Sequence, residues 1–116
     1  MRRVLVADDE AHVRRLLCKV LAQNGYEVEE ASNGQHALEI LRAESAFDLL
    51  VLDLMMPVMG GLEALATVRL EMPELPVLMM NGGHFYTNPP PDVACLCKPF
   101  SLRTLLEQVT TLIHWK

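Results

Sequence analysis

The sequence has few basic residues and no long apolar stretch, and both shortages restrict what the chain can do. Lys and Arg number 10 against 15 Asp and Glu, which gives a net charge of -5 at pH 7. The basic residues form only short pairs such as Arg2-Arg3 and Arg14-Arg15, so no nucleic-acid-binding face is expected. No apolar run approaches the roughly 20 residues that a membrane span requires, and the N-terminus does not resemble a signal peptide. We therefore expect a cytoplasmic chain that binds neither membrane nor nucleic acid.

Cysteine is scarce as well. The chain has three cysteines, an odd number, so a disulfide framework is not expected. We predict that Cys18, Cys95 and Cys97 are small buried thiols in a reducing compartment, with a metal or redox role as the alternative. The length of 116 residues, with 51% hydrophobic and 22% charged residues, is typical of one globular domain, expected over residues 1–116.

Short apolar runs alternate with segments of helical periodicity along the chain. The predicted strands span residues 3–7, 26–31, 47–52, 76–80 and 94–97. The predicted helices span residues 10–24, 62–70 and 102–113, and a further one ends near residue 43. This alternation predicts an α/β fold, a five-stranded parallel sheet with helices on both faces.

Residues 81–93 interrupt the alternation. They contain Gly82-Gly83 and three consecutive prolines at 89–91, which lack amide donors and favour extended backbone. We therefore expect that the helix between the fourth and fifth strands is short or absent.

Charged residues follow three of the predicted strands. Asp8 and Asp9 come directly after the first strand, Asp53 after the third and Lys98 after the fifth. The carboxyl ends of parallel strands meet at one edge of an open α/β sheet, where such folds bind ligands. Carboxylates grouped there repel one another unless a cation is present, and Mg2+ prefers oxygen ligands of this kind. A free oxygen of Asp53 could then attack a phosphoryl group, with Lys98 pairing with Asp53 or with the phosphoryl oxygens.

Three separated motifs agree in order and spacing with one known family. They are Val4-Leu5-Val6-Ala7-Asp8-Asp9-Glu10, Asp48-Leu49-Leu50-Val51-Leu52-Asp53-Leu54-Met55-Met56-Pro57 with Gly60-Gly61, and Lys98-Pro99-Phe100. With them the chain resembles, over its whole length, the receiver domain of two-component response regulators, the CheY-like superfamily. The resemblance implies a doubly wound, flavodoxin-like sheet of strand order 2-1-3-4-5.

The resemblance also implies a role for each residue of the predicted site. Asp53 would accept a phosphoryl group from a sensor histidine kinase or a phosphotransfer protein. Asp8, Asp9 and Asp53, with the backbone carbonyl of Met55, would hold Mg2+, and Lys98 would bind the phosphoryl group. Such a domain is not an enzyme beyond its own phosphoryl transfer and slow autodephosphorylation, and it acts through a downstream protein partner that the sequence does not identify.

Two positions depart from the family pattern. Asn81 stands at the end of the fourth strand, where receivers usually carry a Ser or Thr that moves on activation, and Cys95 replaces an aromatic residue three positions before Lys98. These changes favour an alternative, a pseudo-receiver that acts as a phosphorylation-independent interaction module. A third possibility is a metal-dependent phosphohydrolase, but Met55 occupies the place of its general acid. If the domain is phosphorylated, we expect the change to reach residues 81–93 rather than a fourth-helix face.

Overall fold

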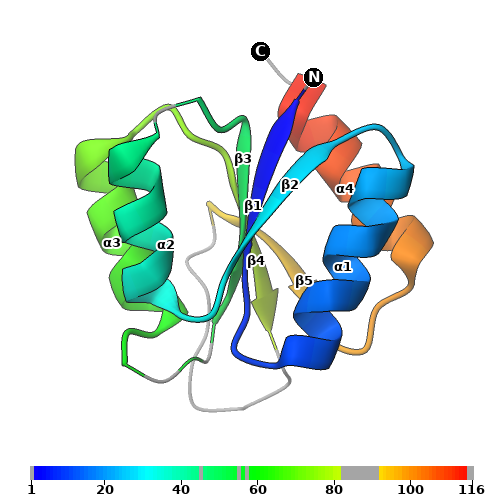
Figure 1. The fold of residues 1–116 in the computed structure, drawn as a ribbon, viewed down its shortest axis with the longest axis horizontal. Helices are drawn as coiled ribbons and strands as arrows, with labels where there is room; N and C mark the ends of the chain where they lie inside the picture. Colours follow the sequence, from blue (N-terminus) through cyan, green and yellow to red (C-terminus); the bar gives the residue numbers. More distant parts are fainter. Residues whose placement is uncertain (1, 45, 55, 57, 82–91, 115–116) are drawn as a thin grey trace.

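A parallel β-sheet covered by helices on both faces forms the fold (Figure 1). The structure is a computed structural model, and it describes residues 2–44, 46–54, 56, 58–81 and 92–114. In order along the chain, the elements in this part are β1 (Arg3–Ala7), α1 (Ala11–Gln23), β2 (Glu27–Ala31), α2 (Gly34–Ala43), β3 (Leu49–Asp53), α3 (Gly61–Glu71), β4 (Val77–Asn81), β5 (Ala94–Cys97) and α4 (Leu102–His114). The described strands form a five-stranded sheet of order β2-β1-β3-β4-β5, which confirms the predicted topology.

The sheet separates two hydrophobic cores. The helices α2 and α3 pack on one face and α1 and α4 on the other, as the two sides of Figure 1 show. The central strand β3 is buried at every position, because both of its faces lie against helices. Its apolar side chains alternate between the cores: Leu50 and Leu52 face α2 and α3, whereas Leu49 and Val51 face α1 and α4.

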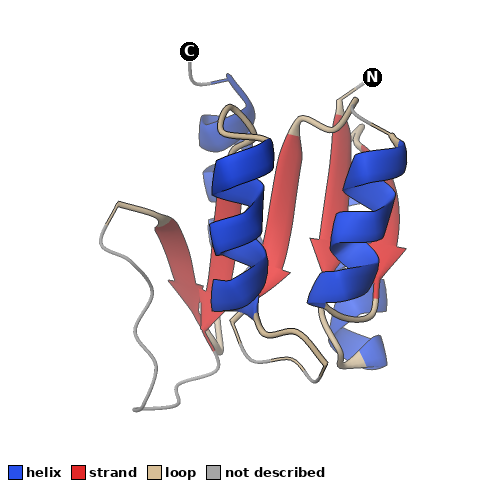
Figure 2. Cartoon of the chain, turned by 90° about the vertical axis from the view of Figure 1, so that its left-hand side faces the viewer, coloured by secondary structure: helices blue, strands red, loops and turns tan. Residues whose placement is uncertain are grey.

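The strands run in the same direction and end at one edge of the sheet, as the arrows in Figure 2 show. In the register of the sheet, Ala7 of β1 lies opposite Leu52 of β3, and Asp53 lies opposite Met80 of β4. The residues that follow β1 and end β3 are therefore brought together at this carboxyl edge.

Local signals in the sequence explain several helix ends. The Asn33 side chain accepts a hydrogen bond of 2.8 Å from the amide of His36 and so caps α2. The Ser101 hydroxyl accepts one of 3.0 Å from the amide of Thr104 and so caps α4. Gly25, with φ of +91°, follows α1 in the conformation expected of glycine after a helix.

The structure shifts the bounds of three strands relative to the prediction, and the second strand begins at Glu27. The third strand begins at Leu49 and includes Asp53, and the fourth includes Asn81, because pairing with the neighbouring strands extends to these polar residues. Four helices lie in the described part of the chain, and β5 is the next described element after β4. The connection at 82–91, for which we predicted no full helix and a change on phosphorylation, lies outside the described residues. No helix in the described ranges is long and apolar enough to cross a membrane.

Candidate functional site

Three carboxylates converge at the carboxyl edge of the sheet. Asp8 and Asp9 follow β1 and Asp53 ends β3, and these two strands are neighbours. One oxygen from each of the three lies within 4.8 Å of the others. Asp8 is fully buried and Asp53 is 3% exposed, whereas Asp9 is open to solvent. The oxygen donors suit a hard divalent cation such as Mg2+, which usually keeps several water ligands as well.

Hydrogen bonds hold the buried carboxylate of Asp8 in place. Its Oδ1 accepts a bond of 2.9 Å from the amide of Glu10, and its Oδ2 accepts one of 3.2 Å from Nζ of Lys98. Its own amide donates to the carbonyl of Ala31 on β2 at 3.2 Å. The first turn of the β1–α1 connection is thus fixed from three directions.

Lys98 brings an ammonium group to the same place from the end of β5. Its Nζ lies 3.2 Å from Asp8 Oδ2, 3.5 Å from Asp53 Oδ2 and 3.9 Å from Glu10 Oε1. Burial acts to lower the pKa of Lys98, but the negative charges of Asp53, Asp8 and Glu10 together outweigh it, so the pKa is raised. Lys98 therefore stays charged at neutral pH. The peptide bond from Lys98 to Pro99 is cis.

The start of α3 lies directly against the backbone of Asp53. A Cβ atom at Gly61 would overlap the carbonyl oxygen of Asp53 and come within 2.7 Å of Cα of Leu54. The amide of Gly61 donates to the carbonyl of Leu54 at 2.9 Å, so the helix is tied to the segment that it touches. Only glycine permits this approach. Met55, whose carbonyl the resemblance to receivers implied as a metal ligand, lies outside the described residues.

Both departures from the family pattern lie on the pair of strands β4 and β5. Asn81 ends β4 opposite Cys97, and its carbonyl accepts a bond of 2.7 Å from the amide of Lys98. Cys95 lies opposite Met79 and packs against the core beneath α2 and α3. Burial, followed by the nearby Cys97, raises the pKa of the Cys95 thiol.

The cysteines are less buried than we predicted. Cys18 and Cys95 are only partly buried, and Cys97 is exposed because it lies near the end of the edge strand β5. The expectation of buried thiols is therefore wrong for Cys97. Burial, with the charge of Glu30, raises the pKa of Cys18 to about 12.

Sequence reasoning missed one residue that contacts the site. Nη1 of Arg14, on α1, donates a hydrogen bond of 2.8 Å to the backbone carbonyl of Asp8. The sequence marked Arg14 only as one half of a basic pair. Arg14 lies one helical turn after Glu10, which is the feature of the sequence that could have placed it near the site. The contact itself, however, depends on how α1 packs on the sheet.

Comparison with known proteins agrees with this geometry. The family described as response regulator receiver domain matches residues 4–87. The chain is 36% identical over 118 residues to the response regulator receiver protein CpdR of Brucella abortus, an alignment that covers 97% of this chain and 98% of CpdR. It is 35% identical to the transcriptional regulatory protein SrrA of Staphylococcus aureus, covering 96% of this chain and 47% of SrrA. The chain therefore spans about half the length of that second relative.

Solved structures show the same fold. The response regulator TrrA of Thermotoga maritima, solved in complex with Mg(2+)-BeF, matches with a TM-score of 0.86 at 32% identity and covers 97% of this chain and 99% of that one. TrrA solved in complex with the histidine kinase ThkA matches with a TM-score of 0.85 at 32% identity, covering 97% and 98%. The chain belongs to the receiver domains of response regulators in two-component systems.

Proposed function

We propose that this receiver accepts a phosphoryl group on Asp53 in a reaction that depends on Mg2+. The observation that carries the proposal is the convergence of Asp8, Asp9 and Asp53 within 4.8 Å, with the ammonium of Lys98 at 3.5 Å from Asp53. In this reading the three carboxylates hold the cation, and the carbonyl of Met55 provides a further oxygen. The phosphoryl donor is a sensor histidine kinase or a phosphotransfer protein.

The chemistry assigned to Asp53 is an in-line displacement. One carboxylate oxygen attacks phosphorus and forms an acyl phosphate, while the bond from phosphorus to the imidazole nitrogen of the donor breaks and its electron pair stays on that nitrogen. When bound, Mg2+ supplies positive charge to the carboxylates and the phosphoryl oxygens. Lys98, already charged and close to Asp53, pairs with a phosphoryl oxygen.

The relatives support this proposal in two ways. A structure 32% identical to this chain carries Mg2+ together with BeF, and the same regulator has been solved with a histidine kinase. Both observations concern TrrA, and we extend them to this chain because its acidic cluster has the residues to bind the same cation.

We further propose that residues 1–116 act as one receiver domain in the cytoplasm and signal by changing their contacts with a downstream protein. A second candidate function is a pseudo-receiver, which binds its partner without phosphorylation. The atypical pair Asn81 and Cys95 favours that candidate, because neither side chain reproduces the usual hydroxyl and aromatic ring of the family switch.

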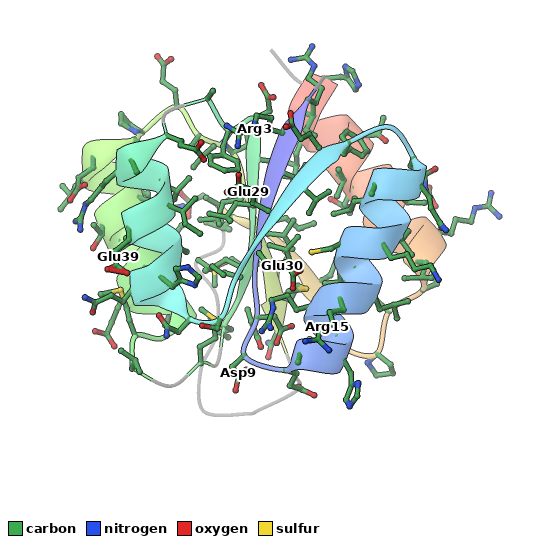
Figure 3. All side chains as sticks on the ribbon, viewed as in Figure 1. Arg3, Asp9, Arg15, Glu29, Glu30 and Glu39 are labelled. Atoms are coloured by element: carbon green, nitrogen blue, oxygen red, sulfur yellow. The ribbon has the colours of Figure 1, made fainter. Side chains whose placement is uncertain are left out.

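Incubation with acetyl phosphate and Mg2+, followed by intact-mass measurement, separates the two candidates. We expect a phosphoryl adduct on the wild-type chain and none on Asp53→Asn. Glu39→Gln, which removes one carboxylate from the exposed surface of α2, is the matched control and should keep the adduct (Figure 3). A wild-type chain that binds Mg2+ and gains no adduct would support the pseudo-receiver.

A further inference from the structure

Arg14, which is not one of the three clustered carboxylates, binds the peptide group that joins Asp8 to Asp9. Arg14 lies on α1, and its side chain is 15% exposed. Its Nη1 donates to the carbonyl of Asp8 at 2.8 Å, and its Nε donates to Oε1 of Glu30 at 2.8 Å. A planar guanidinium that is held at two of its nitrogens keeps one orientation, so the donor that faces Asp8 is fixed.

The bond from Arg14 completes the hydrogen bonding of Asp8. The amide of Asp8 donates to Ala31, and its two carboxylate oxygens accept from Glu10 and Lys98. The carbonyl of Asp8, the fourth polar group, accepts from Arg14. This carbonyl lies in the same rigid peptide plane as the nitrogen of Asp9. Its orientation therefore restricts where the Asp9 carboxylate can lie relative to those of Asp8 and Asp53.

The partner of Arg14 comes from a different strand. Glu30 belongs to β2, which pairs with β1 on the side away from β3. In Figure 3 the labelled Glu30 lies on β2 above Asp9, near the first turns of α1. The contacts of Arg14 thus connect α1, β2 and the residues that follow β1. The carboxylate of Glu30 also offsets the charge of the guanidinium, which would otherwise repel a cation nearby.

We propose that Arg14 is a positioning residue for the divalent cation, and that it orients the Asp8–Asp9 peptide so that three carboxylates converge. The inference rests on the proposed cation site. Arg14 touches neither the cation nor the phosphoryl group, and it acts only through the carbonyl of Asp8. Glu30 in turn sets the orientation of Arg14.

The sign of the effect distinguishes positioning from simple electrostatics. Removal of a positive charge near a cation site strengthens cation binding if the charge acts through space. Removal of the hydrogen bond to Asp8 weakens binding if the residue acts by positioning. Arg14→Met therefore makes the two explanations predict opposite changes.

The test measures divalent-ion affinity directly, by electron paramagnetic resonance of Mn2+ and competition with Mg2+. We expect Arg14→Met to weaken binding about tenfold, the lower end of the loss seen when a group that supports a metal ligand is removed. Arg15→Met is the matched control, because Arg15 is an exposed neighbour on the same helix (Figure 3) and its loss changes the net charge equally. Arg15→Met should bind as the wild type does or slightly more tightly.

Two further variants keep the test decisive if Arg14→Met folds poorly. Arg14→Lys retains one donor, and Glu30→Gln leaves the donor of Arg14 in place but removes the charge that orients it. Each should bind Mn2+ more weakly than the wild type, by less than about tenfold. In phosphorylation by acetyl phosphate, Arg14→Met should raise the Mg2+ concentration for half-maximal rate but reach the wild-type plateau.

Three results would overturn the proposal. The first is that Arg14→Met binds Mn2+ as tightly as the wild type, and the second is that Arg14→Met and Arg15→Met weaken Mn2+ binding equally. The third is that Arg14→Met lowers the plateau rate of phosphorylation without changing its dependence on Mg2+. If the wild-type chain itself binds no divalent ion, the cation site fails and the role of Arg14 fails with it, so the two failures are told apart by the wild-type titration.

Discussion

Replacement of Gly61 by alanine should damage both the stability of the fold and the site. The added methyl group would overlap the carbonyl oxygen of Asp53, lie 2.7 Å from Cα of Leu54 and lie 3.0 Å from the carbonyl carbon of Asp53. All three are backbone atoms, so no side chain can rotate to make room. Either α3 or the end of β3 must move.

The neighbouring Gly60 provides a matched comparison. A Cβ there would find its nearest atoms at 3.7 Å and 3.9 Å, the carbonyl oxygens of Leu54 and Met56, which is ordinary contact. Gly60→Ala should therefore change stability by less than about 0.5 kcal/mol, because the reduced entropy of the unfolded chain offsets a poorer helix N-cap. Gly61→Ala has the same entropic gain but forces overpacking, and we expect it to cost about 3 kcal/mol.

Urea unfolding measures this difference, and about 3 kcal/mol is a large part of the 5–15 kcal/mol that stabilises a typical domain. Because the clash falls on the carbonyl of Asp53, Gly61→Ala should also weaken divalent-ion binding, whereas Gly60→Ala should not. The reasoning is refuted if the two variants unfold at the same urea concentration and bind Mn2+ with equal affinity.

Further predictions concern the charges and thiols. Mg2+ at about a hundred times its dissociation constant should raise the free energy of unfolding of the wild type by about 2.7 kcal/mol, measured by thermal unfolding. Asp53→Asn should lose most of this stabilisation, and an equal stabilisation of both proteins would contradict the cation site. The pKa of Lys98 is raised in the folded protein, so the charged lysine stabilises the fold. This stabilisation is complete below the pKa of an unfolded lysine, about 10.4, and it is lost as pH rises through the pKa of Lys98 in the folded protein. Lys98→Met should accordingly lower the free energy of unfolding at pH 7 by about 2 kcal/mol, the usual contribution of a hydrogen bond between charged groups. The variant should also lose less stability than the wild type at alkaline pH in a pH series of urea unfolding, and an equally steep loss would count against this pairing. At pH 8 a thiol reagent should label the exposed Cys97 first and Cys18, with a pKa of about 12, last, and peptide mapping would identify the labelled cysteines. The reverse order would contradict the burial of these thiols.

The alternating pattern predicted the parallel sheet, the resemblance to receivers implied its strand order, and the sequence pointed to all four charged groups that meet at the site. Asp8, Asp53 and Lys98 each follow or end an apolar run, and parallel strands bring such positions to one edge. The fourth, Asp9, needed only its adjacency to Asp8. The strand bounds at Asp53 and Asn81 were less accurate, because pairing with a neighbouring strand overrides the low strand propensity of a polar residue.

The contacts that hold the site could not be predicted from sequence patterns. The bond from Arg14 to the carbonyl of Asp8 depends on the rotation of α1 about its axis and on Glu30 of a different strand. The sequence likewise identified Gly61 as part of a motif, but only the approach of α3 to Asp53 explains why a glycine is needed there. Both are tertiary contacts, which no local periodicity records.

Chemical mapping of the phosphoryl group tests the central claim most directly. Borohydride reduces an acyl phosphate to an alcohol, so a phosphorylated aspartate becomes homoserine, which mass spectrometry of peptides can place in the sequence. After phosphorylation with Mg2+ we predict homoserine at position 53 and at no other aspartate. Homoserine at Asp8 or Asp9, or a phosphoryl group carried by another residue type, would contradict the assignment of Asp53 as the acceptor.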